Sequence, residues 1–81
     1  MVPRYSMFIQ WSEEDEAYIA TLPEFDGALT HGSTYEEAAK MGAELIQTFI
    51  ELFEADGKPL PKPHEFIYEE RLRTPIGATL K

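Results

Sequence analysis

A long amphipathic helix pattern in the centre of the chain limits the possible folds more than any other feature. Residues 34–37 have the sequence of a capping box, in which the Thr34 hydroxyl accepts the Glu37 amide and the Glu37 carboxylate reaches back. Gly57 suits a left-handed helix end. The helix is therefore predicted to span about residues 35–56, which is about 22 residues or roughly 33 Å.

One side of this predicted helix is apolar. Its apolar residues recur at steps of three and four, which is the spacing of a single helix face. They are Ala38, Met41, Gly42, Leu45, Phe49, Leu52 and Phe53. A chain of 81 residues has room for one small domain, so this stripe is expected to pack against a sheet.

Alternating residues on both sides of the helix predict the strands of that sheet. Residues 4–11 and 17–22 flank an acidic turn and predict a hairpin, and Pro23 ends its second strand because proline has no N–H to donate. A short third strand is expected near residues 28–31 and a fourth over 64–70. The predicted fold is α+β in the order β-β-β-α-β, a small, mostly antiparallel sheet with one long helix packed on one face.

Residues 1–70 are expected to form this single domain. Residues 71–81 show little periodicity, so we expect a loose tail or an arm that becomes ordered in an oligomer. One helix covers one face of a sheet, so apolar residues on the other face would form an exposed patch. Phe8 and Ile67 are the candidates, and they predict self-association as a dimer or tetramer.

The charge of the chain is strongly negative. The net charge is -8, and residues 1–60 hold 12 acids against 3 bases. Such a surface repels nucleic-acid phosphates, so no direct nucleic-acid binding is expected, and it attracts a basic protein. Solubility also accounts for an acid excess, so charge alone leaves both interpretations open. The candidate contacts for a basic partner are Glu13, Glu14, Asp15, Glu24 and Asp26.

The chain contains no cysteine, which excludes disulfides, thiolate metal ligands and cysteine nucleophiles. No segment approaches the ~20 apolar residues of a membrane helix, and the first residues lack the pattern of a signal peptide. A cytoplasmic protein without membrane attachment is expected.

The sequence gives little support for catalysis. His31 and His64 lack a second ligand at metal spacing, and the serines lack a nucleophile elbow. The acidic run 13–16 could hold Mg²⁺ in principle, but consecutive acids at a hairpin tip diverge, which favours a solvated turn. A metal-dependent nuclease using these acids, or Glu24 or Asp26 with His31, is the weaker alternative. No enzyme activity, cofactor or metal is expected.

Several short motifs in order resemble a known family. Residues 17–23 form a strand that ends in proline, residues 30–38 read Thr-His-Gly-Ser-Thr-Tyr-Glu-Glu-Ala, and residues 57–63 read Gly-Lys-Pro-Leu-Pro-Lys-Pro. Over about residues 4–70, this order and spacing are similar to the N-terminal, UPF0150-type domain of the HicB antitoxins. That family typically has a Gly-x-Thr-x-x-Glu-Ala helix start and a Gly-x-x-Leu/Ile-Pro-x-Pro exit.

The resemblance implies a partly degraded ribonuclease-H-like domain that binds and neutralises a small basic mRNA endonuclease of the HicA type. Ribonuclease H chemistry requires carboxylates that hold two metals at the sheet, and the first predicted strand carries none. The activity is therefore expected to be absent, while the fold is shared.

The sequence departs from the family in two places. Many members continue into a helix-turn-helix or ribbon-helix-helix domain, which this sequence does not contain, so operator binding is not expected of it. The loop 23–28 lacks the second proline and the cysteine of many relatives, which bears on toxin specificity. A stand-alone homo-oligomer with a structural or regulatory role and no toxin partner is the alternative function.

Overall fold

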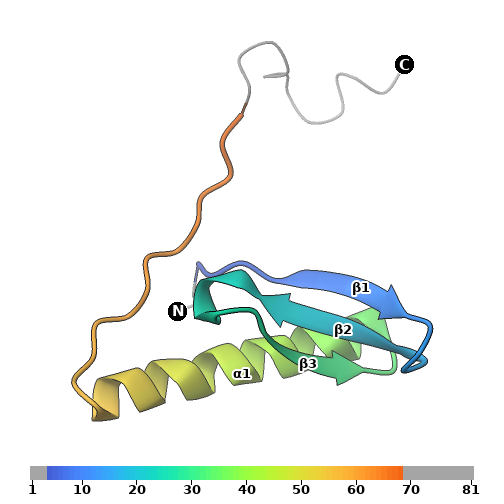
Figure 1. Ribbon diagram of the computed structural model, residues 1–81, viewed down its shortest axis with the longest axis horizontal. Helices are drawn as coiled ribbons and strands as arrows, with labels where there is room; N and C mark the ends of the chain where they lie inside the picture. Colours follow the sequence, from blue (N-terminus) through green and yellow to red (C-terminus); the bar gives the residue numbers. More distant parts are fainter. Residues whose placement is uncertain (1–3, 69–81) are drawn as a thin grey trace.

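The protein is a three-stranded antiparallel sheet covered on one face by one long helix (Figure 1). The computed structural model describes residues 4–68. Its elements are β1 (Phe8–Ser12), β2 (Ala17–Leu22), the short 3-10 helix η1 (Pro23–Phe25), β3 (Ala28–Gly32) and α1 (Tyr35–Ala55). The strand order is β1-β2-β3. The predicted α+β class, with three strands followed by one helix, is confirmed.

Short turns with local hydrogen bonds fix the register of the sheet. β1 pairs with β2 from Phe8↔Thr21 to Ser12↔Ala17, across a turn that the Ser12 hydroxyl closes by donating to the Asp15 carboxylate over 3.0 Å. At the other end, Pro23 ends β2 and begins η1, as the missing proline N–H predicts. The two hairpins therefore place the three strands side by side in sequence order.

The two ends of α1 follow the predicted capping pattern closely. The Thr34 hydroxyl accepts the Glu37 backbone N–H at 3.0 Å. The Glu37 carboxylate accepts the backbone N–H and the hydroxyl of Ser33, one residue earlier than predicted, and these two bonds lower the pKa of Glu37. At the C-terminal end, Gly57 has a φ of +68° and donates to the Glu54 carbonyl, which gives the predicted left-handed helix end.

The core lies between α1 and the helix-facing side of the sheet. Leu22, Phe25 and Ile46 are buried together, and Phe25 stacks on Phe49 with ring centroids 4.9 Å apart. The predicted apolar stripe is confirmed at five positions, which are buried or packed against this core: Ala38, Gly42, Leu45, Phe49 and Phe53. It is wrong at Met41 and Leu52, which are exposed, and it omits Ile46, which is buried. The buried line follows steps of four through Ala38, Gly42 and Ile46, so the face that packs is rotated from the predicted one.

The fourth strand that was predicted over residues 64–70 does not form in its described part. Residues 64–68 are extended but join none of the strands β1, β2 and β3, and residues 69 and 70 lie outside the described part, as does the tail predicted over 71–81. The segment after α1 runs along one end of the sheet and then away from it (Figure 1). Alternation predicts an extended backbone, but it does not show whether a neighbouring strand lies within reach.

Candidate functional site

Among the described residues, no element covers the face of the sheet opposite α1, and this face is partly apolar. Ala20 and Leu22 of β2 are fully buried beneath the helix, so the alternate residues of this strand point the other way. The register aligns two rows of three residues on this open face. One row is Phe8, Thr21 and Leu29, and the other is Gln10, Ile19 and His31. We call these six residues the open face.

Two large apolar side chains of the open face are mostly in solvent. Phe8 is 60% exposed and Leu29 is 61% exposed, whereas Ile19 on the central strand is half-buried between its neighbours. A contiguous apolar patch beside polar side chains is typical of a surface that contacts another protein. The prediction that Phe8 lies on an exposed face is therefore consistent with its position.

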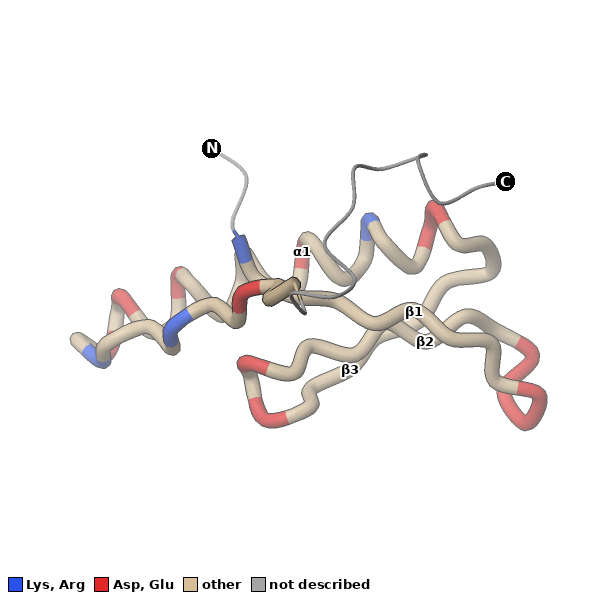
Figure 2. The backbone as a smooth tube through the Cα atoms, turned by 90° about the horizontal axis from the view of Figure 1, so that it is seen from above, with Lys and Arg blue, Asp and Glu red and all other residues tan. Residues whose placement is uncertain are grey.

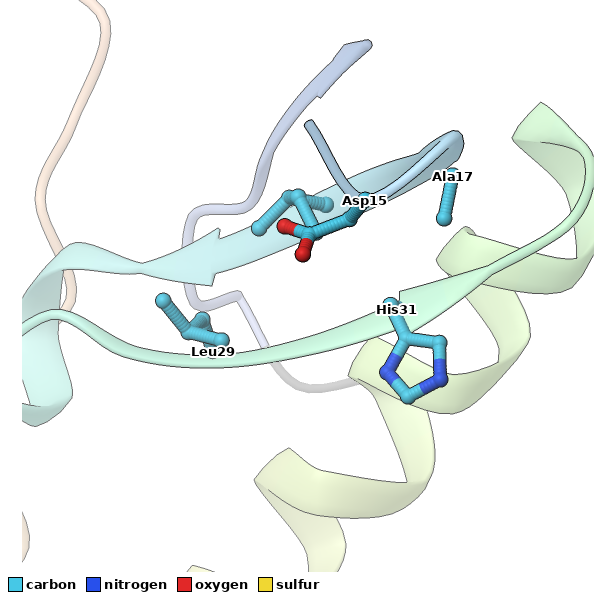
Figure 3. Close-up of a pocket in the computed structure, with 5 residues that line it drawn as sticks. Asp15, Ala17, Leu29 and His31 are labelled. Carbon is cyan, nitrogen blue, oxygen red and sulfur yellow. The ribbon is translucent and has the colours of Figure 1, made fainter. Parts of the chain in front are cut away.

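A hollow of about 350 Å³ lies at one end of the open face. Figure 3 shows Asp15 and Ala17 of the first hairpin on one side of it and Leu29 and His31 of β3 on the other. Ile19 also lines it. The hollow thus combines apolar side chains with one carboxylate and one imidazole, which could receive a side chain that carries both an apolar stem and a positive charge.

The five predicted partner-binding acids divide into two groups. Glu13, Glu14 and Asp15 are exposed together in the turn between β1 and β2, which projects beyond the sheet as an acidic loop (Figure 2). Glu24 and Asp26 lie at the other end of β2, which has six residues and spans roughly 17 Å. The structure therefore brings three of the five acids together in one turn and places the other two at the opposite end of the sheet.

Glu24 has a position that its sequence context did not indicate. Its carboxylate accepts the Ser6 backbone N–H at 3.0 Å, the Ser6 hydroxyl at 2.9 Å and the His64 backbone N–H at 2.8 Å. Burial acts to raise the pKa of Glu24, but these hydrogen bonds outweigh it and the pKa lies below its ordinary value of 4.5. Its partners are 18 and 40 residues away along the chain, so no local motif could have revealed this role.

The residues considered for catalysis are not gathered into one centre. Among residues 4–68, no three histidine, aspartate or glutamate side chains are placed to hold a metal ion. Ser12 and Ser33 form turn and cap hydrogen bonds, and Ser6 binds Glu24. His31 lies on the open face, while the backbone of His64 is held at Glu24. Within the same range, no helix is long and apolar enough to span a membrane.

Ile67, the second predicted self-association residue, lies on the extended segment after α1. It is 78% exposed, and Phe66 beside it is 81% exposed. Sequence reasoning missed Leu29 and Phe66. For Leu29 the signal was present, because the alternation of the short third strand places it opposite the buried side of the sheet.

Comparison with protein families identifies the class to which this fold and its acidic, uncovered surface belong. A family model described as the HicB-like antitoxin of bacterial toxin-antitoxin systems matches residues 5–73, which is most of the chain. Comparisons with curated proteins and with solved structures gave no significant match.

The class is therefore that of antitoxins from bacterial toxin-antitoxin systems, as the motif order predicted. Within that class, the chain belongs to the HicB-like antitoxin family. Membership implies a toxin partner and indicates a non-enzymatic role for this chain.

Proposed function

We propose that this chain binds and neutralises a small basic mRNA endonuclease of the HicA type in the cytoplasm. The observation that carries the proposal is the family match over residues 5–73, because an antitoxin acts on a partner toxin. The net charge of -8 adds support, since an RNA-cleaving toxin needs a basic surface to bind its substrate. Neutralisation then requires only that the antitoxin covers this surface.

Two adjoining parts of the molecule suit such a partner. The acidic turn of Glu13, Glu14 and Asp15 supplies exposed negative charge, which attracts a basic protein over a distance and speeds encounter. The open face beside it supplies Phe8, Ile19 and Leu29 for apolar contact after docking. Asp15 belongs to both, because its side chain lines the hollow on the open face.

Capture of the partner tests the proposal. The tagged protein is purified from its native cells, co-purifying proteins are identified by mass spectrometry, and the complex is sized by light scattering. We expect one small basic protein in fixed stoichiometry, and this protein should cleave RNA when it is separated from the antitoxin. Recovery of the tagged chain alone, at native expression levels, would contradict the proposal.

Charge reversal tests the role assigned to the acidic turn. Changing Glu13, Glu14 and Asp15 together to lysine is expected to slow association with the toxin by about tenfold or more at low salt, because steering depends on these charges. The matched control reverses Glu44, Glu51 and Glu54, which are exposed on α1 away from the open face. Stopped-flow association rates that are equal for the two triple variants would remove the turn from the interface.

A further inference from the structure

The outer edge of β1 is a second unpartnered feature of this fold. β1 pairs only with β2 among the described residues, so its other edge presents backbone N–H and C=O groups without strand partners. The helix packs mainly beneath β2 and β3 and leaves the flank under β1 thinly covered. Trp11 shows this, because it lies on the helix-facing side with Tyr18 and is still 49% exposed.

The same chain carries a segment with the properties of a missing edge strand. Residues 64–68 are extended, and Phe66 and Ile67 are about four-fifths exposed. Phe66 and Tyr68 contact each other with ring centroids 4.8 Å apart, so they share one side of the segment, while Ile67 points to the other. Its two sides are therefore unequal, because one carries two aromatic rings and the other carries Ile67 and the polar Glu65.

The start of this segment is fixed close to β1. The Glu24 carboxylate holds the backbone N–H of both Ser6 and His64, and the Tyr5 hydroxyl donates to the Pro61 carbonyl over 2.7 Å. These bonds attach the segment to the domain at the end of the sheet where β1 begins. Beyond His64 it leaves the domain instead of turning along its own β1 edge (Figure 1).

We propose that residues 64–68 of one copy add as a strand to the outer edge of β1 in a second copy, so that two chains exchange these segments reciprocally. The aromatic side of the incoming segment then covers the flank at Trp11, and Ile67 lies beside Phe8 on the other side of the sheet. Each edge strand gains backbone partners, and the exposed apolar side chains of both copies are buried.

The exchange uses a different surface from the acidic turn and shares only Phe8 with the open face, and it does not rest on the proposed function. The dependence of dimerisation on salt should also be opposite to that of toxin binding. Two copies that each carry a net charge of -8 repel each other, so screening by salt should strengthen the dimer. Binding of an oppositely charged toxin should weaken in the same salt.

Sizing with variants tests the proposal. Analytical ultracentrifugation of the full chain is expected to show a dimer that tightens between 50 and 500 mM NaCl. The double variant Phe66→Ser with Ile67→Ser should weaken dimerisation at least tenfold. Both side chains are exposed in the single chain, so the fold should be kept, and circular dichroism checks this. The control Leu52→Ser removes an exposed apolar side chain from α1 and should leave the dimer unchanged.

A mixture of ¹³C-labelled and unlabelled chains then shows which copy is contacted. Isotope-filtered NOEs between the Ile67 methyl groups and Phe8 are expected across chains. A wild-type chain that stays monomeric at 1 mM, or a dimer that the double variant leaves intact, would overturn the proposal. It would equally be overturned if these NOEs appeared only within uniformly labelled chains, because the segment would then pair with its own β1.

Discussion

At the scale of single residues, Glu24 joins three segments of the domain that are distant in the sequence. Its carboxylate joins the chain before β1, the helix η1 and the segment after α1 through hydrogen bonds from Ser6 and His64. From the sequence, Glu24 was predicted only as an acid facing a partner, because a residue that joins distant segments has no local signature. The acids of the turn were easier to interpret, since consecutive acids at a hairpin tip favour a solvated turn, and residues 13–16 are exposed.

Replacing Glu24 with glutamine should lower the free energy of unfolding by about 1 kcal/mol at pH 7, since charge-assisted hydrogen bonds are weakened. The pKa of Glu24 is lower in the folded chain than in the unfolded chain, so the unfolded chain binds the proton more readily. The contribution is therefore complete above the ordinary value of 4.5 and is lost as the pH falls through the folded pKa. Urea unfolding at pH 7 and at pH 3 should show the wild type and Glu24→Gln converging at the lower pH. A constant difference would show that the carboxylate charge is not involved.

Gly32 is required by a close approach between β3 and α1. A Cβ at this position would lie 2.4 Å from the Ala38 backbone nitrogen and 2.7 Å from the Glu37 carbonyl carbon. Gly32→Ala should therefore cost about 2 kcal/mol, because backbone has to move. At Gly42 a Cβ would meet the flexible Met7 side chain, so Gly42→Ala is the control and should cost less. Thermal unfolding of both variants makes the comparison, and an equal loss would argue against the backbone clash.

At the scale of elements, the ends of α1 were more predictable than its packed face. The capping box and the terminal glycine are local signals, and they placed the helix within one residue at each end. The packed face depends on how the helix crosses the sheet, which periodicity does not specify when apolar residues occur on several sides. For this reason Met41 is exposed although it was assigned to the packed face, and Ile46 is buried although it was not assigned there.

The N-terminal cap of α1 gives a prediction at this scale. Thr34→Ala removes the hydroxyl that accepts the Glu37 N–H and should lower the free energy of unfolding by about 1 kcal/mol. Thr48→Ala is the matched control, because its hydroxyl donates only to the Glu44 carbonyl within an exposed part of the helix. That change should be neutral or slightly stabilising, since alanine has the higher helix propensity. Equal losses in urea unfolding would contradict the capping role.

At the scale of the whole molecule, α1 covers one face of the sheet, and no other described element covers the opposite face. The sequence predicted this imbalance, because one helix can cover only one face of a sheet. It also placed Phe8 and Ile67 in exposed positions. It could not show that residues 64–67 join none of the strands β1, β2 and β3, since pairing depends on the path of the backbone after Pro61 and on the hydrogen bond at His64.

Inhibition of RNA cleavage is the most direct test of the antitoxin function. The purified partner toxin is incubated with mRNA while the antitoxin is titrated, using the wild type, the open-face variant Leu29→Ser, and the matched control Leu52→Ser. We expect the wild type and Leu52→Ser to abolish cleavage near a fixed stoichiometric ratio. The open-face variant should need at least tenfold more protein, because apolar contact area is lost. Undiminished cleavage in the presence of excess wild-type chain would contradict the antitoxin function, and equal inhibition by all three chains would place the toxin on another surface.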